Sequence, residues 1–344
     1  MRVGIAGTGL IGSSIGQGLR SGGTDVVGWD PDPDVLALAR SVEAIDRTAG
    51  SENELLSGGL DLVILAGPPR AVTATVASLD EAGLDPATLV MDVAGVKVPV
   101  ISAVPDGCRF VGTHPMAGRE RSGPEAASPA LFRGAAWVVC GDGASVEDTQ
   151  AVEAVVVSLG GRVVQMTAAE HDEAVAMVSH LPQVLAAVLM TEATDRTSAL
   201  DLAAGSFRDL TRVAASEPSG WVELLAENAS QIKAAVADLS DRLAVISAML
   251  EHDETQLSTY LEAAQASRRQ LAPPVVAVRV ALSDQPGEIA RVGRALEASS
   301  VDLRDLQLRH APHGGGGVLT LSVRPGEAEP LRAALLQQGL LLAT

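Results

Sequence analysis

The chain has 344 residues, a formal net charge of -18, and 47% hydrophobic but only 2% aromatic residues, which predicts two or three domains with aliphatic cores. So acidic a chain argues against nucleic acid and anionic membranes as partners, and no apolar run approaches the roughly 20 residues of a membrane span. The two cysteines, Cys108 and Cys140, lie far apart, which indicates reduced thiols rather than a disulfide or a metal site. The sequence has no signal-peptide pattern, which predicts a cytoplasmic protein.

The first residues predict a dinucleotide-binding turn. A short buried strand at 2–6 runs into the sequence GTGLIG, which begins at Gly7 and is followed by a helix rich in small residues. Gly7 allows a tight turn, Gly9 lets a pyrophosphate approach the backbone, and Gly12 lets the helix pack closely on the strand. The unpaired N–H groups at the start of the helix would face the phosphates.

A second strand at 25–29 ends at Asp30, eighteen residues after Gly12. A carboxylate there would accept hydrogen bonds from the adenosine ribose and would repel a 2′-phosphate, which favours NAD over NADP. The residues expected around NAD are Gly7, Gly9, Leu10, Ile11, Gly12, Asp30, Gly67 and Pro68.

Further strands are predicted at 60–67, 88–95, 109–114 and 136–141. Apolar strands separated by helices are typical of a parallel sheet covered on both faces, so residues 1–165 should form a Rossmann-type, doubly wound domain. Ligands in such sheets bind at the carboxyl ends of the strands. The polar loop THPMAGRERSGPE begins at one of these ends and carries His114 to the expected nicotinamide position.

Residues 166–270 predict a helical domain. The segment 171–194 is expected to be a helix with a kink at Pro182. From Trp221 to Leu250, apolar residues recur in steps of three and four, which predicts one long amphipathic helix. Such a helix needs a partner surface, so we expect a homodimer.

After an expected linker at 267–274, residues 275–344 predict a small domain with a second sheet. The order is strand, helix, strand, strand, helix, strand, with Pro286-Gly287 before the first helix and a Gly314–Gly317 turn between the middle strands. No group in this unit looks catalytic, which favours a binding or regulatory role.

Four motifs, in this order, resemble the prephenate dehydrogenase family: GTGLIGSS near the N-terminus, HPMAGRERSG around His114, HDEAVAMVSHLP around His180 and FRDLTRVAASEPSGW around Arg212. The C-terminal unit, with DQPG at 284–287, resembles an ACT domain, which is ferredoxin-like and typically binds an amino acid. The resemblance implies a Rossmann-type domain, an all-α dimerisation domain and an ACT domain. It also implies NAD-dependent oxidative decarboxylation of prephenate to 4-hydroxyphenylpyruvate in tyrosine biosynthesis, with tyrosine as the effector to test.

The resemblance assigns roles to several residues. His114 would accept the proton of the C4 hydroxyl, and Arg212 would bind a substrate carboxylate through its planar guanidinium. Glu120 would orient a neighbouring arginine or gate the pocket. His180 and Trp221 would line the pocket; the alternatives are a hydrogen-bonded core histidine for His180 and packing at the start of a helix for Trp221. Candidate helpers for the anionic substrate are Arg208, Arg119 and Lys97, whereas His171 is expected only to cap or pack.

Two positions depart from the family pattern. Gly95 stands where the family usually has a serine that is thought to contact the C4 hydroxyl or the histidine. Gln183 stands where the family has a histidine, so the pocket keeps a hydrogen-bonding group but loses a charge. Arogenate and 4-amino-4-deoxyprephenate therefore stay open as substrates. A non-catalytic sensor that binds NAD and an amino acid is the alternative from another class.

Overall fold

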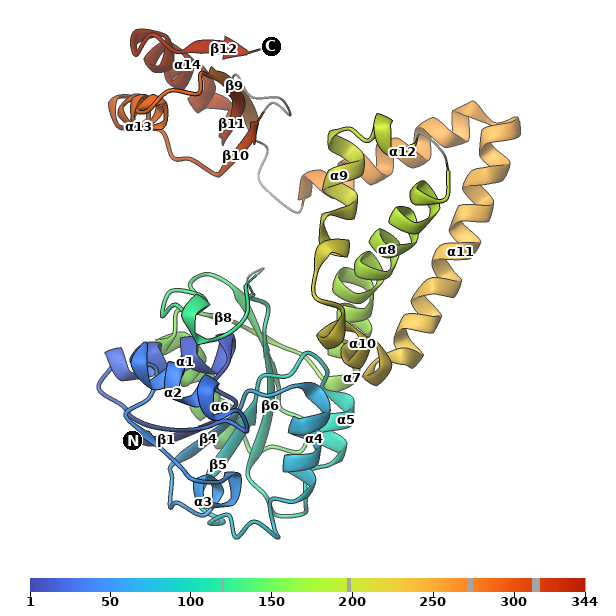
Figure 1. Cartoon of the computed structure of the whole chain (residues 1–344). Coiled ribbons are helices and arrows are strands. Elements are labelled where there is room, and N and C mark those ends of the chain that lie inside the picture. The colour runs from blue at the N-terminus through green and yellow to red at the C-terminus, as the bar shows by residue number, and fades with distance from the viewer. Residues whose placement is uncertain (119–120, 197–198, 271–274, 311–315, 344) are drawn as a thin grey trace. The chain divides into compact units, whose positions relative to one another are not determined.

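The computed structural model describes residues 1–118, 121–196, 199–270, 275–310 and 316–343 (Figure 1). They form two compact units, Met1–Asp241 and Arg242–Thr344, each with its own hydrophobic core. The predicted site residue Glu120 and the candidate helper Arg119 lie outside the described residues.

The first unit is built on an eight-stranded sheet with the order β3-β2-β1-β4-β5-β6-β7-β8. Its six strands from β3 to β6 run parallel, in the order expected of a Rossmann-type domain, which confirms that part of the prediction. The strands are β1 (Arg2–Ala6), β2 (Asp25–Trp29), β3 (Arg47–Thr48), β4 (Leu62–Leu65), β5 (Leu89–Asp92), β6 (Phe110–Pro115), β7 (Ala136–Cys140) and β8 (Arg162–Gln165).

Strand β7 departs from the expected parallel sheet, because it pairs antiparallel with β6. A parallel return needs a crossover, usually a helix, whereas the described residues between β6 and β7 contain only the 3-10 turn η1 (Pro124–Ala126). Strand β8 runs parallel to β7 after the crossover helix α6 (Val146–Ser158). The loop after His114 therefore turns back beside its own strand.

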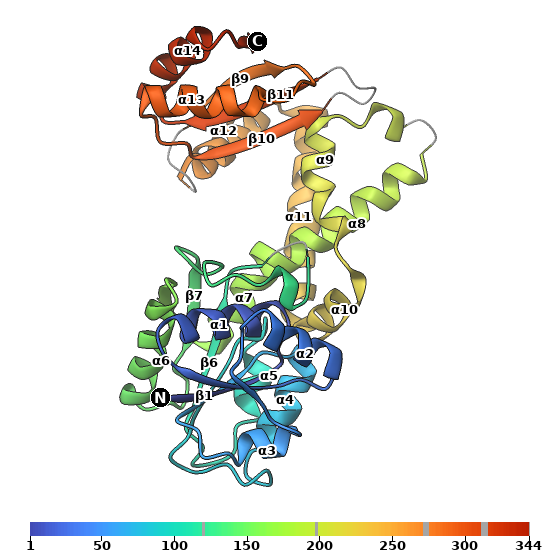
Figure 2. The ribbon, with the colours of Figure 1, turned by 60° about the vertical axis from the view of Figure 1, so that its left-hand side comes forward.

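Alternating strand residues build a core on each face of the sheet. One face carries Val3 and Ile64 against α1 (Leu10–Ser21) and α6. The opposite face carries Val63 and Leu65 against α3 (Glu52–Leu56) and α4 (Pro69–Ala77). Two further helices, α2 (Pro33–Ser41) and α5 (Val98–Ser102), follow β2 and β5, so helices cover both faces (Figure 2).

The chain then becomes helical. Its elements are α7 (Ala168–Val175), the π-helical turn η2 (Ala176–His180), α8 (Leu181–Thr194), the 3-10 turn η3 (Leu200–Leu202), α9 (Gly205–Thr211), the 3-10 turn η4 (Arg212–Ala215), α10 (Pro218–Glu227) and α11 (Ala229–His252). Just before the position of the predicted kink at Pro182, the helix contains the π turn η2. Such turns relieve a backbone that a proline deprives of a hydrogen bond, and they are frequent at functional sites.

The prediction of one long helix from Trp221 to Leu250 is wrong, because Asn228 separates α10 from α11 with backbone angles of φ -110° and ψ 24°. Asn228 is buried, and its Nδ2 donates to the carbonyl oxygen of Asp172 (2.8 Å) and lies 3.2 Å from Nδ1 of His180. A buried amide must find partners, and these tertiary hydrogen bonds outweigh the apolar periodicity of the segment.

Residues Ala168–Thr194 form a continuous stretch of 27 residues that is long and apolar enough for a membrane span, contrary to our expectation from the sequence. Only 33% of its most apolar window is buried within the chain. A single stretch of this kind is weak evidence for a membrane, because a helix that packs on a second protein chain has the same composition.

The second unit begins within α11 and continues with α12 (Glu254–Gln270), so the expected linker at 267–274 starts inside a helix. Residues 271–274 lie outside the described residues. The following elements have the predicted order: β9 (Val276–Leu282), α13 (Glu288–Ser299), β10 (Asp305–His310), β11 (Gly317–Val323), the 3-10 turn η5 (Pro325–Glu327), α14 (Ala328–Gln337) and β12 (Leu341–Ala343). The sheet order is β10-β11-β9-β12, and all neighbouring strands are antiparallel.

Candidate active site

The three glycines of the turn after β1 have different structural reasons. Gly7 has a φ of +94°, and a Cβ there would lie 2.7 Å from the backbone of Ala66. A Cβ on Gly12 would lie 1.9 Å from the carbonyl oxygen of Gly7. A Cβ on Gly9 would meet nothing within 4 Å. The fold therefore requires Gly7 and Gly12, whereas Gly9 keeps open space beside the backbone.

This open space fits the pyrophosphate of a dinucleotide. Helix α1 begins at Leu10 with no side-chain cap and no acidic residue in its first turn, so its first N–H groups can bind an anion. Asp30, at the end of β2, accepts from the backbone N–H of Thr8 (2.7 Å) and of Asp32 (3.1 Å). The carboxylate is therefore fixed beside the turn, where a ribose is expected.

His114 lies near the carboxyl end of β6, at the same edge of the sheet as the glycine turn. The preceding residue anchors the strand, since Thr113 donates from Oγ1 to the carbonyl oxygen of Asp92 (2.6 Å) and accepts from the indole N–H of Trp137 (3.0 Å). Side chains alternate along a strand, so burying Thr113 turns His114 to the other side.

A chain of hydrogen-bonding groups runs back from His114. Its Nδ1 lies 2.9 Å from Nε2 of His171, and Nδ1 of His171 lies 2.7 Å from Oδ1 of Asp172. His171 and Asp172 are buried, and His114 is partly buried. The expectation that His171 only caps or packs is therefore too weak, because its ring is the direct neighbour of the predicted base.

Burial lowers the pKa of His114 well below its usual 6.5, and the positive charge of Lys97 and the rings of His171 and His180 lower it further. Burial likewise lowers the pKa of His180 to about 4. Both imidazoles are thus neutral at neutral pH, and a neutral imidazole can accept a proton.

Two family models match this chain: the nucleotide-binding domain of prephenate dehydrogenase over residues 15–166, and its dimerization domain over residues 167–263. A probable prephenate dehydrogenase, NovF from Streptomyces niveus, is 30% identical, and the match covers 95% of each chain. The chain belongs to the prephenate dehydrogenase family.

Solved structures of the prephenate dehydrogenase family agree with this assignment. Prephenate dehydrogenase from A. aeolicus, in complex with hydroxyphenyl propionate and NAD⁺, is 26% identical and has a TM-score of 0.74, with 79% of this chain and 98% of that chain covered. Synechocystis arogenate dehydrogenase is 26% identical and has a TM-score of 0.70, with 79% of this chain and all of that chain covered.

Gly95 has a structural reason in this member of the prephenate dehydrogenase family. A Cβ at this position would lie 2.8 Å from Cδ1 of Leu224 and 3.8 Å from Cε1 of His114. Leu224 lies on α10, which Arg70 of α4 holds through hydrogen bonds to Glu223 (2.7 Å) and Glu227 (2.8 Å). An apolar side chain therefore lies next to the position of the usual serine.

The structure brings His180 and Trp221 together, with ring centroids 6.4 Å apart, and it buries Gln183 on α8. Oε1 of Gln183 is buried and has no hydrogen-bond partner among the described residues. A buried carbonyl without a partner destabilises a fold by about 1–3 kcal/mol, so the unpaired Oε1 suits a site that a hydrogen-bond donor on a ligand completes.

Arg212 and Arg208, the arginines expected to bind the substrate, have no hydrogen bond to His114 among the described residues. Arg212 lies exposed on η4 and Arg208 lies exposed on α9. Lys97 is completely buried and forms an ion pair with Asp92. Lys97 was a candidate helper for the anionic substrate, but its charge is already paired with Asp92 in the interior.

The sequence did not predict that Asp172, Asn228 and Leu224 lie in the candidate site, where they contact His171, His180 and the Gly95 position, respectively. The only local signal was the His171-Asp172 pair in the first turns of a helix that opens with the capping box of Thr167 and Glu170. Their function depends on neighbours from other elements, which spacing alone does not predict.

Proposed function

We propose that this protein is an NAD-dependent dehydrogenase that oxidises and decarboxylates prephenate to 4-hydroxyphenylpyruvate. The observation that carries the proposal is His114, a partly buried and neutral imidazole at the same sheet edge as a glycine turn that fits a dinucleotide. Membership of the prephenate dehydrogenase family and the A. aeolicus complex with NAD⁺ support it.

The chemistry requires a transient base. Bound NAD⁺ would supply the acceptor for the hydride of substrate C4. As C4 becomes a carbonyl, its hydroxyl proton goes to His114. When the ring carboxylate leaves as CO₂, its bonding electrons enter the ring, and the phenolate oxygen takes the proton back from His114. The proton balance closes, so His114 works as a shuttle.

The other site residues position the substrate in this proposal. Arg212 binds a carboxylate through its guanidinium, with Arg208 as a neighbouring cation, and this local charge offsets the net charge of -18. Gln183 accepts a hydrogen bond at its unpaired Oε1 from a donor on the ligand, and His180 and Trp221 form a wall of the pocket. Glu120 orients an arginine or gates the site.

The substrate can be tested directly, and arogenate is the second candidate because the Synechocystis relative is an arogenate dehydrogenase. Purified protein is incubated with NAD and separately with prephenate, arogenate or 4-amino-4-deoxyprephenate, and NADH absorbance is followed. We expect the highest kcat/KM with prephenate. No NADH with any of the three would reject the enzyme and leave the sensor hypothesis.

We infer a homodimer through the helical part of the chain. The matched model is a dimerization domain, and apolar side chains are exposed on η2 and α8: Met177, Val178, Val188 and Leu189. A monomer rarely exposes such a row to water. Light scattering coupled to size exclusion should give twice the monomer mass of 35.2 kDa, and a monomer at micromolar concentration would contradict the inference.

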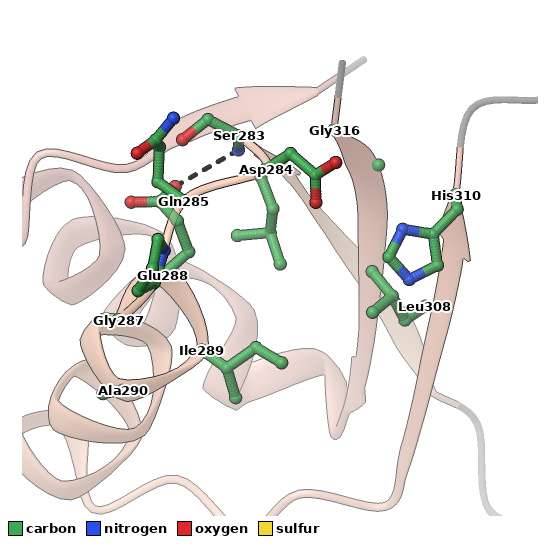
Figure 3. A pocket seen from close by; sticks show the side chains of 13 residues that line it. Ser283, Asp284, Gln285, Gly287, Glu288, Ile289, Ala290, Leu308, His310 and Gly316 are labelled. Carbon is green, nitrogen blue, oxygen red and sulfur yellow. Dashed lines mark hydrogen bonds between the residues drawn. The ribbon is translucent and has the colours of Figure 1, made fainter. Parts of the chain in front are cut away.

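We also propose that residues 275–344 form a regulatory ACT domain, after the NAD domain 1–165 and the helical domain 166–270. A pocket of about 540 Å³ lies between the β9–α13 connection, β10 and β11, and is lined by Asp284, Gly287, Glu288, Ile289 and His310, among others (Figure 3). The amides that begin α13 can bind an amino-acid carboxylate, and Asp284 can bind its ammonium group. Tyrosine should inhibit turnover or raise the melting temperature, and no effect on either would exclude it as the effector.

A further inference from the structure

The donor and acceptor roles in the chain His114–His171–Asp172 are fixed at its Asp172 end. Its Oδ1 accepts from the backbone N–H of Lys97, and its Oδ2 accepts from the backbone N–H of Val98, both at 2.8 Å. Backbone amides can only donate, so both carboxylate oxygens act as acceptors. Oδ1 also lies 2.7 Å from Nδ1 of His171, and that ring nitrogen must therefore carry a hydrogen.

The hydrogen on Nδ1 of His171 fixes the role of the other ring nitrogen of His171. A neutral imidazole carries one hydrogen, so Nε2 of His171 is an acceptor when Nδ1 is the donor. Nε2 lies 2.9 Å from Nδ1 of His114, and the two rings meet edge to face with an interplanar angle of 74°. Nδ1 of His114 must then be the donor, which leaves its Nε2 with a free lone pair.

We propose that His171 and Asp172 are positioning residues that hold His114 in the tautomer with hydrogen on Nδ1, so that Nε2 is the nitrogen that takes the substrate proton. The consequence for catalysis rests on the proposed dehydrogenase function. The tautomer itself depends only on the hydrogen bonds of the unliganded chain.

The same chain also matters once His114 is charged. Lys97 after β5 opposes a positive charge there, and His171 on α7 and His180 on η2 would do so only in their protonated forms. Lys97 is itself paired with Asp92. The protonated ring would point its Nδ1–H along a hydrogen-bonded chain that ends on the Asp172 carboxylate, which offsets part of this opposition.

The opposite direction makes a different prediction. If His171 donated from Nε2, His114 would accept at Nδ1 and would carry its hydrogen on Nε2. It could then donate to the substrate hydroxyl but could not take its proton. The two arrangements are distinguishable, because protonated and unprotonated ring nitrogens have well-separated ¹⁵N chemical shifts.

The first experiment uses the unmodified full chain, labelled with ¹⁵N only at its 6 histidines. Long-range ¹H–¹⁵N spectra near pH 7.5 are assigned with a His114→Asn variant, whose missing signals identify the ring. We expect Nδ1 of His114 to be protonated and Nε2 to be bare. A protonated Nε2 with a bare Nδ1 would overturn the proposal.

The second experiment compares His171→Phe with His171→Gln. Phenylalanine keeps the ring volume but removes the acceptor, so kcat should fall about tenfold or more while KM and NAD affinity stay near wild type. Glutamine can accept from His114 through Oε1, so it should recover part of kcat. Wild-type kcat in a folded His171→Phe, or equal losses in both folded variants, would overturn the proposal.

These outcomes separate the two hypotheses. If neither variant folds, the ¹⁵N measurement on the unmodified chain still decides the tautomer. If the wild-type protein turns over none of the three substrates, the dehydrogenase function fails while the tautomer result stands.

Discussion

The glycine turn and the histidine cluster differ in how they are assembled. The turn is six consecutive residues, Gly7 to Gly12, and each of its requirements follows from spacing. The cluster joins His114 on β6, His171 and Asp172 on α7, and Asn228 between α10 and α11. A binding turn can therefore be predicted from neighbours in sequence, whereas a proton-transfer site depends on partners from distant segments.

The largest expected effect is that of His114→Asn, which should impair the histidine cluster but not the glycine turn. His114→Asn removes the base but leaves the glycine turn intact, so kcat should fall about 10²-fold or more while NAD affinity is unchanged. Turnover and NAD fluorescence titration measure the two effects. Unchanged turnover would show that His114 is not the base.

A matched pair of glycine variants divides the turn itself. Gly9→Ala enters open space and should melt like wild type, but should weaken NAD binding about tenfold because the pyrophosphate loses its close approach. Gly12→Ala places a Cβ against the carbonyl of Gly7 and should destabilise the fold by about 1–3 kcal/mol. Thermal melting with NAD titration checks both. A destabilised Gly9→Ala would contradict the distinction.

Restoring a serine in the cluster should have a smaller effect. Gly95→Ser forces the end of Leu224 to move and should cost about 1 kcal/mol in the free energy of unfolding, with a several-fold change in kcat. The double variant Gly95→Ser, Leu224→Ala removes the clash, so its free energy of unfolding should match that of Leu224→Ala alone. If Gly95→Ser is as stable as wild type, Leu224 does not explain the glycine.

The smallest expected effect is in the pH profile. In the proposed mechanism the neutral form of His114 is the active one, and its pKa lies well below 6.5, so activity should be lost only as pH falls through that lowered value. Between pH 8 and 6.5, kcat/KM should therefore change less than twofold. A midpoint near or above 6.5 would mean that the free enzyme uses a group with an ordinary or raised pKa.

Much of the fold was predictable because its signals are local. The strand before Gly7, the carboxylate after β2 and the apolar strands at 60–67 and 88–95 were enough to predict a parallel, Rossmann-type sheet, whereas the short edge strand β3 was not predicted. The reversal at β7 was not predictable, because strand direction depends on what connects β6 to β7 and not on the apolar residues of 136–141.

The site divides in the same way. His114, Gly95 and His180 were identified from motifs, whereas the break at Asn228 was hidden inside an apolar repeat that a continuous helix would satisfy equally well. The partners of His171 became visible only when α7 was packed against β6 and the loop after β5. The roles of Arg212 and Glu120 remain predictions.

Lys97 has a practical consequence for chemical labelling. The chain has two lysines, of which Lys233 is exposed while Lys97 is fully buried in its ion pair with Asp92. Of the two lysines, an amine-reactive dye should attach at Lys233, which leaves the site untouched. A dye found on Lys97 would report that the interior behind His114 had opened, so this side chain is a built-in indicator of local unfolding.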